Sequence, residues 1–261
     1  MKKEVDPSMA FWYICLKAIS MLKYLMAGIV AFLSLSLHGQ KVDHGPWTEL
    51  LQKYVDPYGK VDYKAFKNDE EKLDAYLKKL SGNPPDPKWK VDEQKVFWIN
   101  AYNAFTIKLI LDHYPVKSIK DINDGDKDAW HIPFIELGGK MYTLDYIEKT
   151  MLLGQFNDPR IHFAINCSAR SCPPLRNKAY TSENINIELR LAARSFINDE
   201  RFNILSKNHV QISRIFEWYE KDFLAEEGSI QVYLNKNTPH VDISEKASIN
   251  YLNYNWDLNS N

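Results

Sequence analysis

The chain has 261 residues, of which 45% are hydrophobic and 13% aromatic, enough for a sizeable packed core. Its 33 basic and 34 acidic residues leave a formal net charge of -1. This balance removes the electrostatic basis for binding nucleic acid or an anionic membrane surface, so we expect no nucleic-acid partner.

Residues 1–40 have the pattern of a targeting segment. Lys23 precedes an apolar run over 24–37, and small or polar residues follow. This is the layout of a cleavable secretory signal peptide, so we expect a secreted or periplasmic protein. Met21 is a candidate for the true start, because the twenty residues before it make an unusual N-terminal region. The alternative is an uncleaved segment that anchors the protein and provides its only membrane contact.

Residues 41–261 then form one domain, which begins with helices. An amphipathic helix is predicted over 68–80 from its leucine and tyrosine spacing. Asp92 can cap a second helix over 93–114, which Pro115 ends. Over 96–111 this second helix is apolar almost all round, so we expect it to be central and buried.

The middle of the chain contains a hairpin and a short helix. Gly138 and Gly139 can form the turn of a hairpin in the sequence FIELGGKMYTL. Thr143 can cap a short helix over 144–153. The stretch 160–167 is predicted as a strand, since it is rich in apolar residues.

The C-terminal third continues with short elements. A strand is predicted over 209–212, and the aromatic-rich tail over 249–259 is expected to pack back on the body. Helices are predicted over 183–198, 214–224 and 230–237, capped by Ser182, Ser213 and Ser229. The fold class that follows is α+β: a helix-rich single domain with a small antiparallel sheet.

Two asparagines on the central helix are the first candidate site residues. Asn100 and Asn103 lie three positions apart, so they share a face in an apolar environment. A buried amide needs hydrogen-bond partners. Either the two amides fix nearby loop backbone, or one of them orients a catalytic imidazole, as the third member of a Cys-His-Asn arrangement does.

The stretch HFAINCSARSCPPL (162–175) holds the two cysteines outside residues 1–40. On a regular strand His162 and Cys167 would point to opposite faces, which counts against a local His–Cys dyad. His131, in the aromatic-rich sequence DAWHIPF, is the alternative base. Cys167, at the end of the predicted strand, is the candidate nucleophile.

Three interpretations of Cys167 and Cys172 remain open. They can form a disulfide, which suits an oxidising compartment. Cys167 can be a catalytic thiol whose pKa nearby arginines lower. A metal site with His162 is disfavoured, because the C-x4-C spacing is wider than that of common zinc sites and no second cysteine pair exists. We therefore predict no metal.

Other motifs add little. Asp145 and Glu148 are three apart on a predicted helix, which is typical of a solvated face. No P-loop, dinucleotide-binding fingerprint, G-x-S-x-G or H-E-x-x-H motif is present, and no cofactor is predicted.

The chain resembles domain-of-unknown-function family 547, found in secreted bacterial proteins and in plant proteins. The resemblance runs over about 54–258 and rests on five motifs in the right order: FWINAYNAFTI (97–107), LGGKMYTLDYIE (137–148), DPRIHFAINCSARSCPPL (158–175), YTSENINIEL (180–189) and RIFEWYEKDF (214–223). The family has no settled activity to carry over.

What the resemblance implies concerns single residues. The family's characteristic positions in this chain are those of Asn100, Asn103, Glu148, His162, Cys167, Pro173 and Pro174. In plant relatives the position of Cys172 is commonly serine, whereas that of Cys167 stays cysteine, which weakens an obligatory disulfide. Relatives often have a histidine directly after Glu148; here it is Lys149, so a mechanism that needs that histidine is in doubt.

The asparagine, histidine and cysteine together are similar to the residue set of papain or transglutaminase, by analogy of residue types alone. One hypothesis is a cysteine-dependent hydrolase or acyltransferase acting on an amide or thioester. Its nucleophile would be Cys167, its base His162 or His131, and its orienting residue Asn100 or Asn103. The alternative is a binding module in which these residues form a structural polar core. A disulfide exchange protein is a third, weaker hypothesis.

Overall fold

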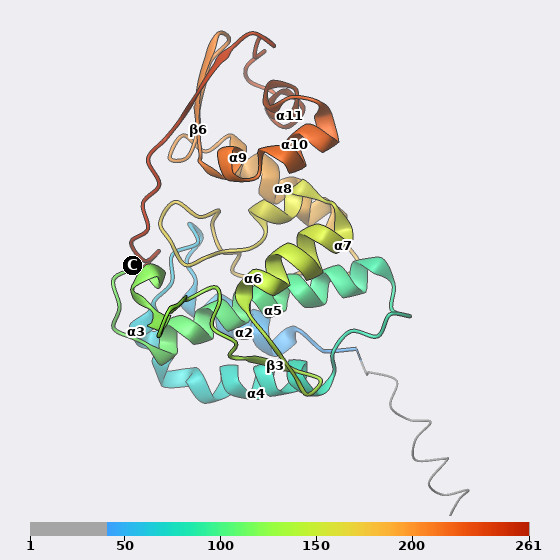
Figure 1. The fold of residues 1–261 in the computed structure, drawn as a ribbon, viewed down its shortest axis with the longest axis vertical. Helices are drawn as coiled ribbons and strands as arrows, with labels where there is room; N and C mark the ends of the chain where they lie inside the picture. The colour runs from blue at the N-terminus through green and yellow to red at the C-terminus, as the bar shows by residue number, and fades with distance from the viewer. Residues whose placement is uncertain (1–40, 261) are drawn as a thin grey trace, which may run out of the picture. The chain divides into compact units, whose positions relative to one another are not determined.

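The computed structural model describes residues 41–260 of the chain (Figure 1). The predicted signal peptide, its alternative as an anchor and the Met21 start lie outside these residues. No helix within 41–260 combines the length and apolar character that crossing a bilayer requires.

The α-helices of the described part are α2 (Gly45–Tyr54), α3 (Tyr63–Phe66), α4 (Glu70–Gly82), α5 (Val91–Asp112), α6 (Leu144–Tyr146), α7 (Gly154–Phe156), α8 (Ile185–Ile197), α9 (Ile215–Trp218), α10 (Glu220–Glu227) and α11 (Ile230–Asn237). Short 3-10 helices are η1 (Lys67–Asp69), η2 (Ile119–Asp121) and η4 (Pro159–Phe163), and η3 (Ile147–Leu153) is a π-helix. The strands are β1 (Asn123–Asp124), β2 (Lys127–Asp128), β3 (Ile135–Leu137), β4 (Lys140–Tyr142), β5 (Ile204–Leu205), β6 (His209–Ile212) and β7 (Ser248–Tyr251).

Helix α5 is central and buried, as predicted. It packs against α3, α4, α6 and η3, and together with α2 these elements enclose the larger hydrophobic cluster. Its capping differs from the prediction: Lys90 is the N-cap residue, and Glu93 accepts a hydrogen bond from the Lys90 backbone N–H at 3.1 Å. Asp92 lies in the first turn instead, where a negative charge is still favourable.

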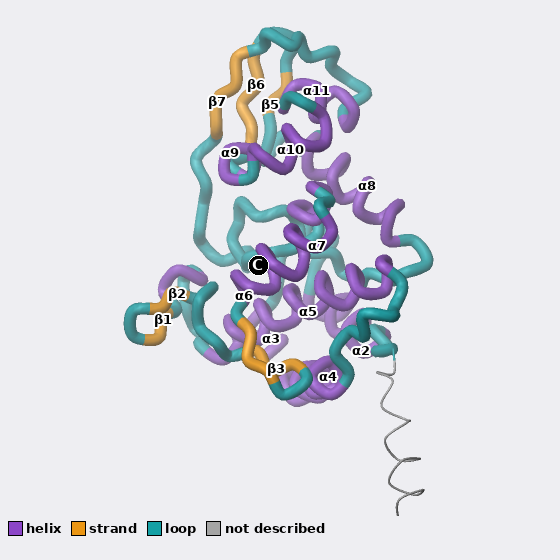
Figure 2. Tube along the Cα trace, turned by 45° about the vertical axis from the view of Figure 1, so that its right-hand side comes forward, coloured by secondary structure: helices purple, strands orange, loops and turns teal. Residues whose placement is uncertain are grey.

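A second hydrophobic cluster lies around α8, α10 and α11 and contains Phe163, Phe196, Phe216 and Phe223. The sheet β5-β6-β7 belongs to this region (Figure 2).

The hairpin β3-β4 with its Gly138-Gly139 turn is confirmed. The helix-rich α+β class is confirmed as well, although β6 and β7 pair in parallel. Helices α9, α10 and α11 lie between β6 and β7 in the chain, and this crossover lets β7 run in the same direction as β6.

The predicted strand over 160–167 is wrong. The segment begins with η4, in which Pro159 takes the first position and Asp158 accepts a hydrogen bond from the Arg160 N–H at 3.1 Å. An aspartate cap followed by proline favours a helical turn. Residues 161–166 are all buried, so their apolar character reflects burial on every side rather than a strand.

The C-terminal tail packs back on the body, as predicted. After β7 it descends toward α3 (Figure 1) and forms backbone bridges between Asp257 and Ser118 and between Leu258 and Ala169. Its end is fixed by the Tyr63 hydroxyl, which donates to Asn259 Oδ1 at 2.6 Å. This path brings the tail beside the loop that carries the two cysteines.

Candidate functional site

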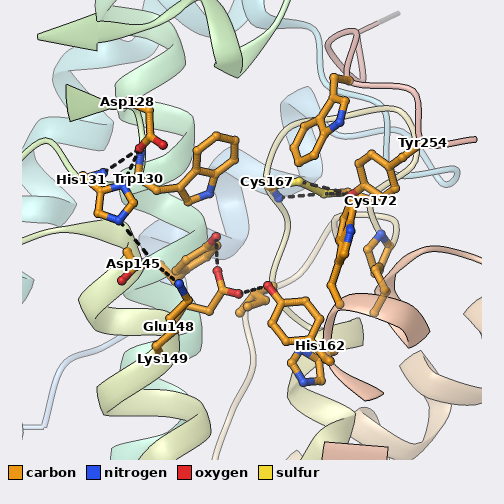
Figure 3. Close-up of a pocket in the computed structure, with 17 residues that line it drawn as sticks. Asp128, Trp130, His131, Asp145, Glu148, Lys149, His162, Cys167, Cys172 and Tyr254 are labelled. Carbon is orange, nitrogen blue, oxygen red and sulfur yellow. Dashed lines mark hydrogen bonds and ion pairs between the residues drawn. A yellow bond between two sulfur atoms is a disulfide. The ribbon is translucent and has the colours of Figure 1, made fainter. Parts of the chain in front are cut away.

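A pocket of about 250 Å³ contains most of the predicted site residues. Glu148, His131, His162 and Cys167 all line it, whereas Asn100 and Asn103 do not. The complete lining is Tyr102, Asp128, Trp130, His131, Asp145, Glu148, Lys149, His162, Ile165, Cys167, Cys172, Pro173, Ile215, Trp218, Tyr219, Tyr254 and Trp256. Figure 3 shows Trp130 and His131 on one side, the two cysteines and Tyr254 on the other, and Glu148 between them.

Glu148 is a buried carboxylate held by two tyrosine hydroxyls. Its residue is 7% exposed, so the predicted solvated face is wrong at this position. Tyr102 Oη donates to Glu148 Oε2 at 2.8 Å, and Tyr219 Oη donates to Oε1. Tyr102 comes from α5, whereas Tyr219 comes from the break between α9 and α10. The predicted single helix over 214–224 is therefore interrupted, and the interruption places the Tyr219 hydroxyl on Glu148.

His131 lies among acidic side chains at the edge of the pocket. Its Nδ1 is 2.7 Å from Asp128 Oδ1, and its Nε2 is 3.9 Å from Asp145 Oδ1. Asp145 itself pairs with Lys149 Nζ at 2.6 Å. Burial alone raises the pKa of Asp128, but the hydrogen bond and charge of His131 outweigh it and hold that pKa below its ordinary value. His131 is thus oriented by carboxylates and is more than half exposed.

His162 lies on η4 and is enclosed by aromatic rings. Its Nε2 is 2.7 Å from Asp222 Oδ2, and its side chain is 1% exposed. Its ring centroid is 4.0 Å from that of Tyr219 and 5.5 Å from that of Phe223. Within the described residues no hydrogen bond joins either His162 or His131 to Cys167. Neither histidine therefore acts as the partner of Cys167 in this form.

Cys167 and Cys172 form a disulfide, with their Cα atoms 6.2 Å apart. The disulfide interpretation is therefore confirmed, and the nucleophile prediction for Cys167 is wrong for this form, because a disulfide sulfur has no thiolate to attack with. Cys172 Sγ also accepts hydrogen bonds from the Cys167 N–H at 3.0 Å and from the Tyr254 hydroxyl at 3.1 Å. The bridge forms part of the pocket wall.

Asn100 and Asn103 fix loop backbone, which was the first of their two predicted roles. Asn100 bonds the Tyr180 backbone in both directions, each at 3.0 Å. Asn103 Nδ2 donates to the Ala164 carbonyl at 2.9 Å, and its Oδ1 accepts from the Asn166 N–H at 2.8 Å. The prediction that one of them orients an imidazole is wrong, because both amide ends are occupied by backbone.

The aromatic lining of the pocket is not predicted by the sequence. Trp218, Tyr254 and Trp256 contact one another, and Trp130 contacts Trp256, with ring centroids 4.6–5.7 Å apart. The sequence signal was present in the aromatic-rich tail and in the sequence around Trp130. Nothing local indicates that these segments meet, because more than a hundred residues separate them.

The pocket combines two kinds of chemical group. Its aromatic rings provide apolar contact, and its carboxylates are fixed by neighbours. Within residues 41–260 no group of three histidine, cysteine or acidic side chains is arranged to hold a metal ion.

Comparison with known proteins identifies one family. Residues 87–197 match the family described as "Protein of unknown function, DUF547". This stretch includes Asn100, Asn103, Glu148, His162 and Cys167 and ends before the aromatic residues of the tail. No curated protein and no solved structure matched the sequence. The segment over residues 87–197 is therefore assigned to the DUF547 family.

Proposed function

We propose that this protein is a binding module that takes a small organic molecule into the pocket around Glu148. The observation that carries the proposal is the composition of the pocket: aromatic rings line it, a buried carboxylate lies inside it, and a disulfide closes part of its wall. Small-molecule sites typically combine apolar walls with a few fixed polar groups.

The cysteine-dependent hydrolase or acyltransferase has less support. Such an enzyme needs a thiolate, and the Cys167 sulfur is bonded to that of Cys172. Its proposed orienting residues, Asn100 and Asn103, hold backbone instead. Thiol–disulfide exchange is disfavoured by the burial of Cys172, which is 5% exposed and contacts Tyr254.

A secreted or periplasmic location is part of the proposal. Disulfides form and persist in oxidising compartments, so the Cys167–Cys172 bridge supports a location of this kind. The signal-peptide pattern of residues 1–40 supports the same location.

Replacing Trp130 by alanine is expected to weaken ligand binding by about tenfold or more, because buried aromatic anchors provide much of the energy of a binding site. The measurement is a ligand-detected NMR screen of mixed small molecules against the full chain, followed by titration of the molecules that bind. Tyr146→Ala is the matched control, since Tyr146 is 45% exposed and lies outside the pocket lining. If no molecule binds, or if Trp130→Ala binds all of them as well as the wild type, the proposal fails.

A further inference from the structure

Glu148 is buried, and within residues 41–260 it has no ion-pair partner. Among residues 41–260 no lysine, arginine or histidine nitrogen lies within ion-pair distance of its carboxylate. The nearest cation along the chain, Lys149, is 2.6 Å from Asp145 instead. Burying a charge without a partner is costly, so a cation brought by a ligand would be a favourable partner for this carboxylate.

The hydroxyl groups around Glu148 belong to neutral tyrosines. Burial first, and then the charge of Glu148, raise the pKa values of Tyr102, Tyr219 and Tyr254 above their ordinary value. These tyrosines are therefore neutral. Two of them donate hydrogen bonds to Glu148 without bringing a positive charge next to it.

Aromatic rings surround the space next to this carboxylate. Tyr254 and Trp256 have ring centroids 4.6 Å apart, and Trp130 approaches Trp256 edge-on at 5.7 Å. In Figure 3 the rings of Trp130 and Tyr254 border the space beside Glu148 from two sides. The face of an aromatic ring carries partial negative charge and attracts cations, most strongly in tryptophan.

We infer that the ligand of this pocket is an organic cation, specifically an ammonium group that carries alkyl substituents. The alkyl groups would contact the aromatic rings, and the positive charge would lie next to Glu148, which has no ion-pair partner among residues 41–260. A bare ammonium or a metal ion fits less well, since each needs several oxygen acceptors, and Asp128 and Asp145 are already paired with His131 and Lys149. The inference rests on the proposed binding function and adds the chemical class of the ligand.

The test compares choline with its neutral carbon isostere, in which a tert-butyl group replaces the trimethylammonium group. Both are titrated into the full-length, oxidised protein by isothermal calorimetry. We expect choline to bind at least about tenfold more tightly than the isostere, because only choline carries the charge. We expect Glu148→Gln to remove this preference, while Glu136→Gln, an exposed glutamate on β3, keeps it.

The outcomes separate this inference from the proposed function. If the isostere binds as tightly as choline, or if the NMR screen finds ligands but choline does not bind, the cation inference is wrong and the binding function stands. If neither the screen nor the titrations find any ligand, both are wrong. Thermal unfolding of Glu148→Gln checks its fold, and the comparison of the two ligands on the wild type does not depend on that variant.

Discussion

Replacing Asn103 by leucine is expected to lower the free energy of unfolding by about 2–5 kcal/mol. The substitution leaves the Ala164 carbonyl and the Asn166 N–H buried without partners, and each such group costs about 1–3 kcal/mol. Chemical denaturation measures the effect. Asn123→Leu is the control, because Asn123 is exposed on β1. A loss of less than about 0.5 kcal/mol in Asn103→Leu would show that the loop does not depend on this amide.

In the variant Asn103→Asp the free energy of unfolding is expected to depend on pH. A protonated carboxyl can donate to the Ala164 carbonyl and accept from the Asn166 N–H, whereas an ionised one repels the carbonyl oxygen. Burial and this hydrogen bond should therefore raise the pKa of the introduced aspartate above the unfolded value of about 3.9. The stability of Asn103→Asp relative to the wild type is therefore highest below about pH 3.9, and it falls as the pH rises through the folded-state pKa of the introduced aspartate.

The second large effect is expected at Lys95, whose replacement by methionine should cost about 2–4 kcal/mol. Lys95 is 6% exposed on α5, and its Nζ lies 2.8 Å from Asp158 Oδ2. Asp158 caps η4, the segment that carries His162, so the ion pair ties the site to the central helix. Arg160 still pairs with Asp158 at 2.8 Å, which limits the loss.

The Lys95 effect should depend on pH in a defined direction. Burial alone raises the pKa of Asp158, but hydrogen bonds from Arg160 and Lys95 outweigh it and hold that pKa below its ordinary value. The carboxylate therefore stabilises the fold above an unfolded pKa of about 3.9, and this contribution is lost as the pH falls. The difference between wild type and Lys95→Met should be largest at neutral pH and shrink below about pH 4. Lys140→Met, at an exposed position on β4, should show neither effect. A difference that stays constant from neutral to acidic pH would contradict the ion-pair explanation.

Much of the framework could be predicted from local patterns. The buried helix α5 follows from its apolar residues on every face, and the β3-β4 hairpin follows from Gly138-Gly139. The caps at Thr143 and Ser229 are also confirmed, since each side chain accepts a hydrogen bond from a backbone N–H of its helix. These features depend on neighbours within one or two turns, which is why the sequence reveals them.

The site was harder to predict because its parts come from distant segments. The segment over 160–167 is buried on all sides, so its apolar pattern cannot distinguish a strand from η4. The helical spacing predicts a solvent-facing Glu148, because nothing near it in sequence indicates that Tyr219 covers it. The pairing of Cys167 with Cys172 was one of three open interpretations, since spacing permits a disulfide without requiring one.

The closed disulfide is what distinguishes a binding pocket from a thiol active site. Cys167 is only partly buried and lines the pocket, so a free thiol at this position would be accessible to reagents. Bonded to Cys172, the same sulfur is chemically protected and serves as part of the wall.

The most direct test is alkylation of the folded protein, purified without reductant, by iodoacetamide at neutral pH, with peptide mapping by mass spectrometry. We predict that neither Cys167 nor Cys172 is modified, that the peptides containing them are recovered joined, and that both residues are alkylated after reduction and unfolding. Modification of Cys167 in the unreduced protein, at a rate above that of an ordinary free thiol, would contradict the binding-module proposal and restore the cysteine nucleophile.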